Sequence, residues 1–139
     1  MAGILSKDIT LSYKTLTSGD YTLIPDLQEV PDIGGSAEKV DVTTLADGNY
    51  KYINGIKDFG DLAFKFLYNN SGATSNYRIC RGLEESEEVV NWRIEFPDGT
   101  TFDFAGEAST AIDSTGVNSA ITFTLNITLN SDIAVTNPA

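Results

Sequence analysis

Four glutamates crowd into one short stretch and form the densest group of side chains that could do acid–base chemistry. They are Glu84, Glu85, Glu87 and Glu88. Two carboxylates hydrolyse a glycosidic bond when they face each other across a cleft and one has a raised pKa. A run of acids in sequence is more typical of a solvated surface. A carboxylate-based hydrolase is therefore the least favoured reading, and no catalytic residue is assigned.

Histidine is absent from the chain, and cysteine occurs once, as Cys80. The missing imidazole excludes Ser-His-Asp and Cys-His catalysis, His-ligated zinc and a histidine pH switch. A single thiol excludes an internal disulfide, and Cys80 is predicted to be a small core residue. We expect a protein that is not an enzyme and that uses no metal or other cofactor.

The net charge of −11 comes from 20 acidic and nine basic residues in a chain of 139. Nucleic acid is held through clustered Lys and Arg, so this charge argues against a protein that wraps nucleic acid. We expect one domain over residues 1–139, with no secretory signal and no membrane anchor. One cysteine without a partner fits synthesis in a reducing cytoplasm.

Alternating apolar and polar residues predict a mainly β protein. The longest run is Ile121 to Asn130, with Ile and Leu on one face and Thr and Asn on the other. Val90 to Phe96 and the segment after it form a hairpin around the turn Pro97–Thr100. Asp61 to Tyr68 alternates with two partly apolar faces, which suggests burial on both sides or a second packing partner. Weaker strands are expected at Asp8–Tyr13 and Ala37–Val42, and an extended segment broken by Pro25 at Tyr21–Val30.

One helix is predicted over residues 73–85, with Thr74 or Ser75 as its N-cap. Tyr77, Cys80 and Leu83 form its apolar stripe, which we expect to close an open end or edge of the β structure. Glutamates near its C-terminus oppose the helix dipole, which hints at a basic residue of another chain.

The segment Thr43–Gly60 lacks a sustained period and is predicted to be a long inter-strand loop. Its apolar and aromatic residues would expose a patch to water in a monomer. Either the loop folds back on its own domain or it docks on another chain, and the second is favoured. The residues concerned are Leu45, Tyr50, Tyr52, Ile53, Ile56 and Phe59.

The order of the segments along the chain is more specific than any single motif. The segments are Tyr21–Gly35, Ala37–Asp47, Tyr52–Phe66, Phe96–Phe102 and Val117–Asp132. In this order they resemble the major tail tube protein of long, non-contractile-tailed bacteriophages. The resemblance covers about Tyr21 to Pro138, without the additional C-terminal immunoglobulin-like domain that some of these proteins carry.

That resemblance implies a β-sandwich or barrel-like tail tube fold with one flanking helix, related to the type VI secretion tube protein. It implies hexameric rings that stack into a hollow tube in the virion, through which DNA passes without specific binding. The 43–60 loop and the terminal segments, including the tail 133–139, would contact neighbouring rings. Expected partners are the tail terminator, tape measure and baseplate proteins.

The acidic composition fits a channel along which DNA slides, because like charges repel the phosphates. Candidate lumen-facing residues are Asp41, Asp61, Asp103 and Glu107. The same charge makes copies repel one another, so assembly is expected to be easier at higher salt. The alternative function is a carbohydrate- or ligand-binding β-sandwich module that stacks ligands on Tyr50 and Tyr52.

Overall fold

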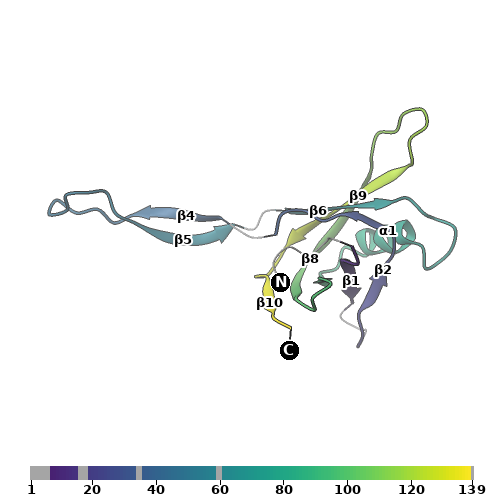
Figure 1. The fold of residues 1–139 in the computed structure, drawn as a ribbon, viewed down its shortest axis with the longest axis horizontal. Helices are drawn as coiled ribbons and strands as arrows, with labels where there is room; N and C mark the ends of the chain where they lie inside the picture. The colour runs from purple at the N-terminus through teal and green to yellow at the C-terminus, as the bar shows by residue number, and fades with distance from the viewer. Residues whose placement is uncertain (1–6, 16–18, 34–35, 59–60, 139) are drawn as a thin grey trace.

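A computed structural model describes residues 7–15, 19–33, 36–58 and 61–138. Within these residues the chain forms ten strands and one helix, so the prediction of a mainly β protein with one short helix is confirmed. Eight of the strands belong to one sheet, and the remaining two pair only with each other. Figure 1 shows the large sheet as the body of the molecule and the separate pair as an arm that extends from it.

The large sheet is antiparallel in every pair, and it combines pairs of consecutive strands with pairs of strands that are distant in sequence, such as β1 with β7 and β6 with β9. The path runs β2-β1-β7-β8-β9-β6-β3, with β10 beside β8. The strands are β1 (Thr10–Lys14), β2 (Thr22–Ile24), β3 (Leu27–Glu29), β6 (Asp61–Leu67), β7 (Val90–Glu95), β8 (Thr101–Ile112), β9 (Thr122–Leu129) and β10 (Ala134–Thr136).

The long strand β8 carries the sheet from one layer of the sandwich into the other. Its first half pairs with β7, and its second half pairs with β9. Gly106 belongs to both registers, opposite Val90 and opposite Leu129. A Cβ at this position would lie 2.4 Å from the carbonyl oxygen of Thr128. Only glycine therefore fits at the point where β8 passes from one layer to the other.

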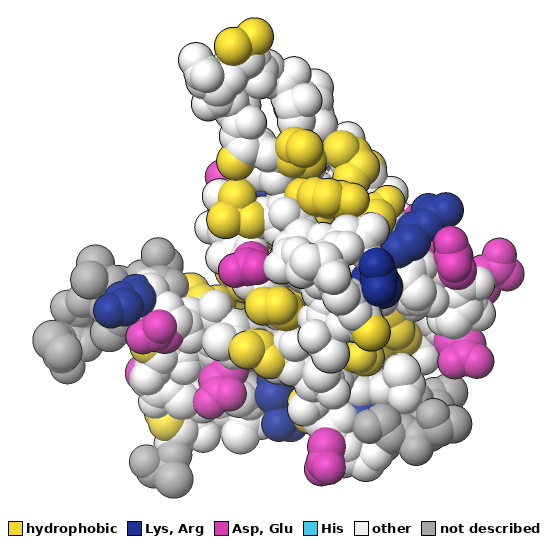
Figure 2. Space-filling view, turned by 90° about the vertical axis from the view of Figure 1, so that its right-hand side faces the viewer, with side chains coloured by type: hydrophobic (Ala, Val, Ile, Leu, Met, Phe, Trp, Pro, Cys, Tyr) yellow, Lys and Arg dark blue, Asp and Glu magenta, His cyan; other side chains and the backbone are white. Residues whose placement is uncertain are grey.

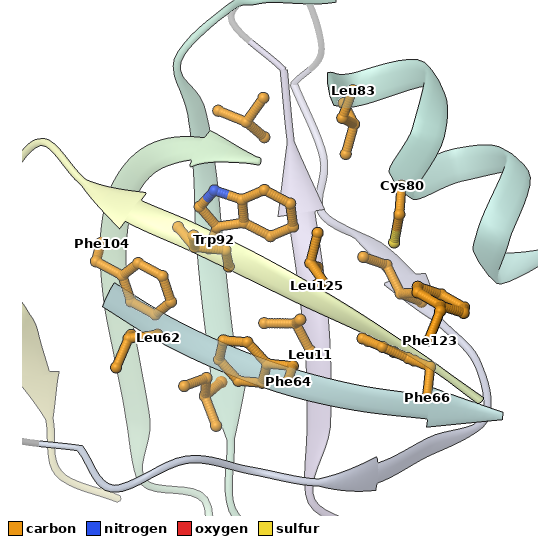
Figure 3. Close-up of a cluster of buried hydrophobic side chains, with 14 residues drawn as sticks. Leu11, Leu62, Phe64, Phe66, Cys80, Leu83, Trp92, Phe104, Phe123 and Leu125 are labelled. Carbon is orange, nitrogen blue, oxygen red and sulfur yellow. The ribbon is translucent and has the colours of Figure 1, made fainter. Parts of the chain in front are cut away.

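The core fills the space between the two layers, whose strands run across one another (Figure 3). Trp92 is fully buried there, as its alternation predicted, and its indole N–H donates to the Gly106 carbonyl at 3.1 Å. The alternating apolar faces of β6, β7 and β9 point inward as expected. The core residues of these strands are Leu62, Phe64, Phe66, Val90, Trp92, Ile94, Phe123, Leu125 and Ile127.

Helix α1 (Asn76–Ser86) packs beside β8 and starts slightly later than predicted. Ser75 is the N-cap residue, but its hydroxyl accepts from the Gly72 N–H and does not cap the helix. Cys80 and Leu83 face the core. Asn76 is also fully buried, and its amide donates to the carbonyls of Pro25 (3.0 Å) and Leu67 (2.7 Å). These bonds connect the first turn of the helix to the ends of β2 and β6.

Two predicted boundaries need correcting. Residues 52–58 form strand β5, so only part of the predicted 43–60 loop is a loop. The strand escaped detection because the side chains described on it, those of residues 52–55, are solvated on both faces, which removes the alternation that marks a half-buried strand. The tail 133–139 contains β10, paired with β8. Of the two alternatives for the second face of Asp61–Tyr68, burial within this chain is wrong, since Ala63 and Leu67 are exposed, and a second packing partner stays a prediction.

Candidate assembly surfaces

The arm is a two-stranded hairpin formed by β4 (Ser36–Asp41) and β5 (Tyr52–Asp58). Local hydrogen bonds order its tip: the Asp47 carboxylate pairs with Lys51 at 2.8 Å and accepts from the Thr44 N–H at 2.8 Å. These contacts lower the pKa of Asp47, the bond from Lys51 contributing most. The tip is therefore an ordered turn, although an isolated two-stranded hairpin is only marginally stable in water.

The register divides the arm into two unlike faces. Val40 lies opposite Ile53, and Val42 continues the same face, so three exposed aliphatic side chains share one side. On the other side Asp41 lies opposite Tyr52, and the Lys39 ammonium sits 5.9 Å from the centre of the Tyr52 ring. We call the side with Val40, Val42 and Ile53 the aliphatic face of the arm.

Most of the residues predicted to form an intersubunit loop lie exposed on this arm. Leu45 is fully exposed, Tyr50 is 78% exposed, and Tyr52 and Ile53 are each more than half exposed. Ile56 lies on β5, but its side chain is outside what the structure describes, and Phe59 lies outside the described residues. Val40 and Val42 are not among the predicted contact residues, although their alternation with Lys39 and Asp41 in the sequence was a usable signal.

A polar face covers the outer side of the layer formed by β8, β9 and β6. Thr128 lies between Glu107 and Asp61, and Asn126 lies between Ser109 and Ala63. Paired residues point to the same side of a sheet, so two of the four lumen candidates, Asp61 and Glu107, share one surface. We call this surface the polar face; its members are Asp61, Ala63, Lys65, Leu67, Glu107, Ser109, Ala111, Asp113, Thr122, Thr124, Asn126 and Thr128.

Asp113 organises the far end of the polar face. Its carboxylate accepts from the hydroxyls of Thr122 and Thr124, both at 2.7 Å, and Lys65 lies 4.0 Å away. The two threonine hydrogen bonds lower the pKa of Asp113, and Lys65 adds to the effect. The face therefore carries three carboxylates and one lysine, and side-chain contacts hold Asp113 in place. Sequence patterns did not single out Asp113.

The other two lumen candidates lie elsewhere. Asp103 belongs to the part of β8 that pairs with β7, and it binds Arg93, whose Nε lies 2.7 Å from Oδ1. The Arg93 guanidinium lies 4.2 Å from the centre of the Tyr21 ring. Asp41 lies on the arm and accepts from the Thr43 N–H at 2.8 Å. Tertiary structure thus brings together two of the four predicted acids.

The cluster of four glutamates does not form a catalytic pair. The Glu84 carboxylate accepts from the Thr110 hydroxyl (2.9 Å) and N–H (3.1 Å), and it also pairs with Arg81. Burial raises the pKa of Glu84, but the bonds from Thr110 and Arg81 outweigh it and the net direction is downward. Glu85 pairs with Arg81 as well, so a basic residue of this chain compensates both acids.

Other kinds of site find little support in the described residues. Burial raises the pKa of the Cys80 thiol to about 12, which suits a core residue. No group of three or more Cys, Asp or Glu side chains in the described part of the chain could hold a metal ion. None of the helices found there is long and apolar enough to cross a membrane.

A cavity of about 660 Å³ lies at the base of the arm. Phe96 and Phe102 form part of its wall, with ring centres 5.1 Å apart, and Glu29 and Asp32 add carboxylates. The cavity is open and mixed in polarity, and it contains no converging acid–base pair.

The comparisons with known proteins agree on one family and one fold. The family described as phage tail tube protein matches residues 10–138. None of the curated proteins compared matches the chain. The tail of an empty gene transfer agent particle, solved with C6 symmetry, is 20% identical and superposes with a TM-score of 0.74 over 96% of this chain and 99% of that one.

Two further structures have the same fold at lower identity. The tail tube of SPP1 is 11% identical, with a TM-score of 0.72 over 98% of this chain and 80% of that one. A chain of the six-fold symmetrised anti-feeding prophage baseplate is 13% identical, with a TM-score of 0.76 over 99% and 97%. These likenesses support the sandwich, including the arm and the helix, as one recurring fold.

Proposed function

The chain belongs to the phage tail tube protein family, and from that premise we propose that six copies form a ring and that rings stack into the hollow tail tube. The family is structural and not enzymatic, and its members are components of phage and phage-like particles. The tube would carry DNA into the host without binding it specifically. The six-fold symmetry of the similar gene transfer agent tail supports the ring size.

The exposed arm is the observation that carries the proposal. Hydrophobic side chains stand on both faces of a hairpin that extends from the body (Figure 1). Such a hairpin gains stability only when another surface covers it. We assign the arm to contacts between rings, with Leu45, Tyr50, Tyr52, Ile53 and Ile56 as contact residues and Phe59 as a further candidate.

The polar face is the surface best suited to line the lumen. Its threonine, serine and asparagine side chains are short and uncharged, and carboxylates outnumber lysine three to one among its members. Such a surface repels phosphates weakly and offers no cluster of cations to hold them. We assign Asp61 and Glu107 to the lumen and place Asp103 and Asp41 away from it.

Tail assembly also requires proteins that start, measure and end the tube. Similar chains occur in a baseplate and in a tube-terminating cap of other injection systems. We propose that the two ends of the tube bind a baseplate protein and a terminator protein, and that a tape measure protein occupies the lumen during assembly.

Electron microscopy of the purified protein tests this function directly. Negative-stain images across a range of salt concentrations are expected to show rings and hollow tubes, with more tubes at higher salt because screening weakens repulsion between acidic copies. A protein that stays monomeric at every salt concentration, alone and with its tail partners, would overturn the proposal. Tube yield that falls steadily as salt is added would contradict the account of the charge.

A further inference from the structure

One side of strand β8 has no strand partner over residues 108–112 within the described part of the chain. The pairing of β7 with β8 ends at the rung Val90–Gly106, whereas β9 follows β8 as far as Ile112. The Asp113 N–H donates to the carbonyl of Thr122 at 3.0 Å, so the odd-numbered residues of this half of β8 direct their backbone groups toward β9. The even-numbered residues direct theirs to the other side. We call that side of residues 108–112 the β8 edge.

Glu84 of helix α1 occupies the centre of the β8 edge. Its carboxylate accepts from the Thr110 N–H at 3.1 Å and from the Thr110 hydroxyl at 2.9 Å. The same carboxylate pairs with Arg81, and the Glu84 side chain is only 24% exposed. An ionised acceptor forms stronger hydrogen bonds than a neutral one. The central donor of the β8 edge is therefore bound by a side chain of its own chain.

The β8 edge nevertheless reaches the surface. Ile112, at its end, is 49% exposed. Helix α1 lies at the end of the molecule away from the arm (Figure 1). Figure 2 looks at that end and shows acidic and basic side chains next to one another, beside hydrophobic ones. A second chain can therefore approach the edge from solvent, and the contact between Glu84 and Thr110 is what blocks it.

A ring of copies has a use for this edge. The layer that carries the polar face has the strand order β8-β9-β6-β3, so the β8 edge and β3 are its two outer sides. Each presents backbone groups that another strand can extend. In a ring of identical copies, every contact joins two different surfaces, one from each neighbour. Closing this layer into a continuous wall brings the β8 edge of one copy to β3 of the next.

Resting on the proposed ring, we infer that the contact between Glu84 and Thr110 is autoinhibitory. It keeps the β8 edge closed in the single chain, and it opens when β3 of the neighbouring copy supplies a backbone carbonyl to the Thr110 N–H. The released Glu84 carboxylate stays paired with Arg81. The contact thus raises the protein concentration at which rings form, and it protects the free chain from irregular pairing of strand edges.

Glu84→Ala opens the edge and tests the inhibition. The variant is expected to form rings at a protein concentration about tenfold lower than the unmodified chain, because a hydrogen bond to a charged group no longer competes with the incoming strand. Glu85→Ala is the matched control: it removes the same charge from the same helix and also frees Arg81, but none of the described contacts joins Glu85 to Thr110. Light scattering as a function of protein concentration measures the onset of assembly.

Hydrogen exchange at the Thr110 amide shows what replaces the carboxylate. In the free Glu84→Ala chain this amide is expected to exchange rapidly. In assembled Glu84→Ala it is expected to exchange slowly, because a carbonyl of the next copy then accepts the N–H. Rapid exchange in the assembled variant overturns the inference, since no strand would be paired with the β8 edge.

The outcomes separate this inference from the proposed function. Tubes from the unmodified chain, with an onset for Glu84→Ala no lower than for Glu85→Ala, overturn the inference and leave the proposed function standing. Absence of rings from both the unmodified chain and Glu84→Ala defeats the two together. If circular dichroism shows that Glu84→Ala is unfolded, Glu84→Gln is compared with Glu85→Gln; a smaller shift in the same direction is expected, and an equal onset overturns the inference.

Discussion

Arg93 on β7 and Asp103 on β8 lie directly opposite each other and form a two-bond ion pair, with Nε–Oδ1 at 2.7 Å and Nη2–Oδ2 at 3.3 Å. The pair lies on the layer of the sandwich away from the polar face. Asp103 is thus held in an ion pair within the chain, whereas Asp61 and Glu107 have no ion-pair partner among the described residues.

Asp103→Asn is expected to affect stability and leave assembly unchanged. Both side chains of the pair are partly exposed, so loss of the charge costs about 0.5–1 kcal/mol of unfolding free energy. Urea denaturation measures this cost, and electron microscopy should show normal tubes. A variant that folds normally but forms no tubes would place Asp103 at an interface.

The double substitution Asp61→Lys with Glu107→Lys is expected to make the tube retain DNA. It replaces two carboxylates by two ammonium groups on the polar face, which creates the cation cluster that phosphates bind. Co-sedimentation of short duplex DNA with assembled tubes measures retention, which should fall as salt rises. Glu88→Lys with Glu95→Lys makes the same charge change away from this face and serves as the control; equal retention by the two variants would count against the lumen assignment.

Gly106→Ala is expected to destabilise the fold by about 1–3 kcal/mol, because the added methyl meets backbone and the sheet must shift. Gly82→Ala is the contrast: it adds the same atom in open space within α1 and is expected to stabilise the helix by up to about 1 kcal/mol. Thermal unfolding of the two variants compares these effects. Equal melting temperatures would show that β8 does not depend on the close approach to Thr128.

Tyr50→Ala is expected to reduce tube formation while leaving the fold intact. The ring is 78% exposed at the tip of the arm, so its removal deletes little that the single chain buries. Turbidity or electron microscopy measures assembly, and far-ultraviolet circular dichroism measures folding. Loss of folding would instead mean that the tip packs on its own domain.

Acid is expected to weaken the fold, in part through Asp113. Hydrogen bonds from Thr122 and Thr124 lower the pKa of this carboxyl in the folded state. A lowered pKa contributes stability above the ordinary carboxyl pKa of about 4, and this stability is lost as the pH falls through the folded value. Urea denaturation between about pH 7 and pH 3 should show the decrease, and Asp113→Asn should be less stable at neutral pH and less sensitive to acid. An identical pH dependence in the variant would contradict this role.

The alternation of side chains predicted most of the body correctly. A period of two assigns residues to the inside or the outside without reference to a partner, which is why Trp92, Phe64 and Leu125 were placed in the core. Alternation did not predict strand β5, because its described side chains are solvated on both faces and its composition resembles a loop. The helix was found from its own stripe, with Cys80 and Leu83 on the buried side.

Which acids share a surface was decided by the tertiary structure alone. Asp103 and Glu107 point outward from the same strand, yet β8 pairs with β7 at one and with β9 at the other, so they lie on different layers. Asp61 joins Glu107 only through Thr128 between them. The sequence by itself determined the strands, their buried sides, the acidity and the resemblance to tail tube proteins. Register and layer depend on contacts between residues distant along the chain, and these contacts determined how the polar face and the arm are arranged.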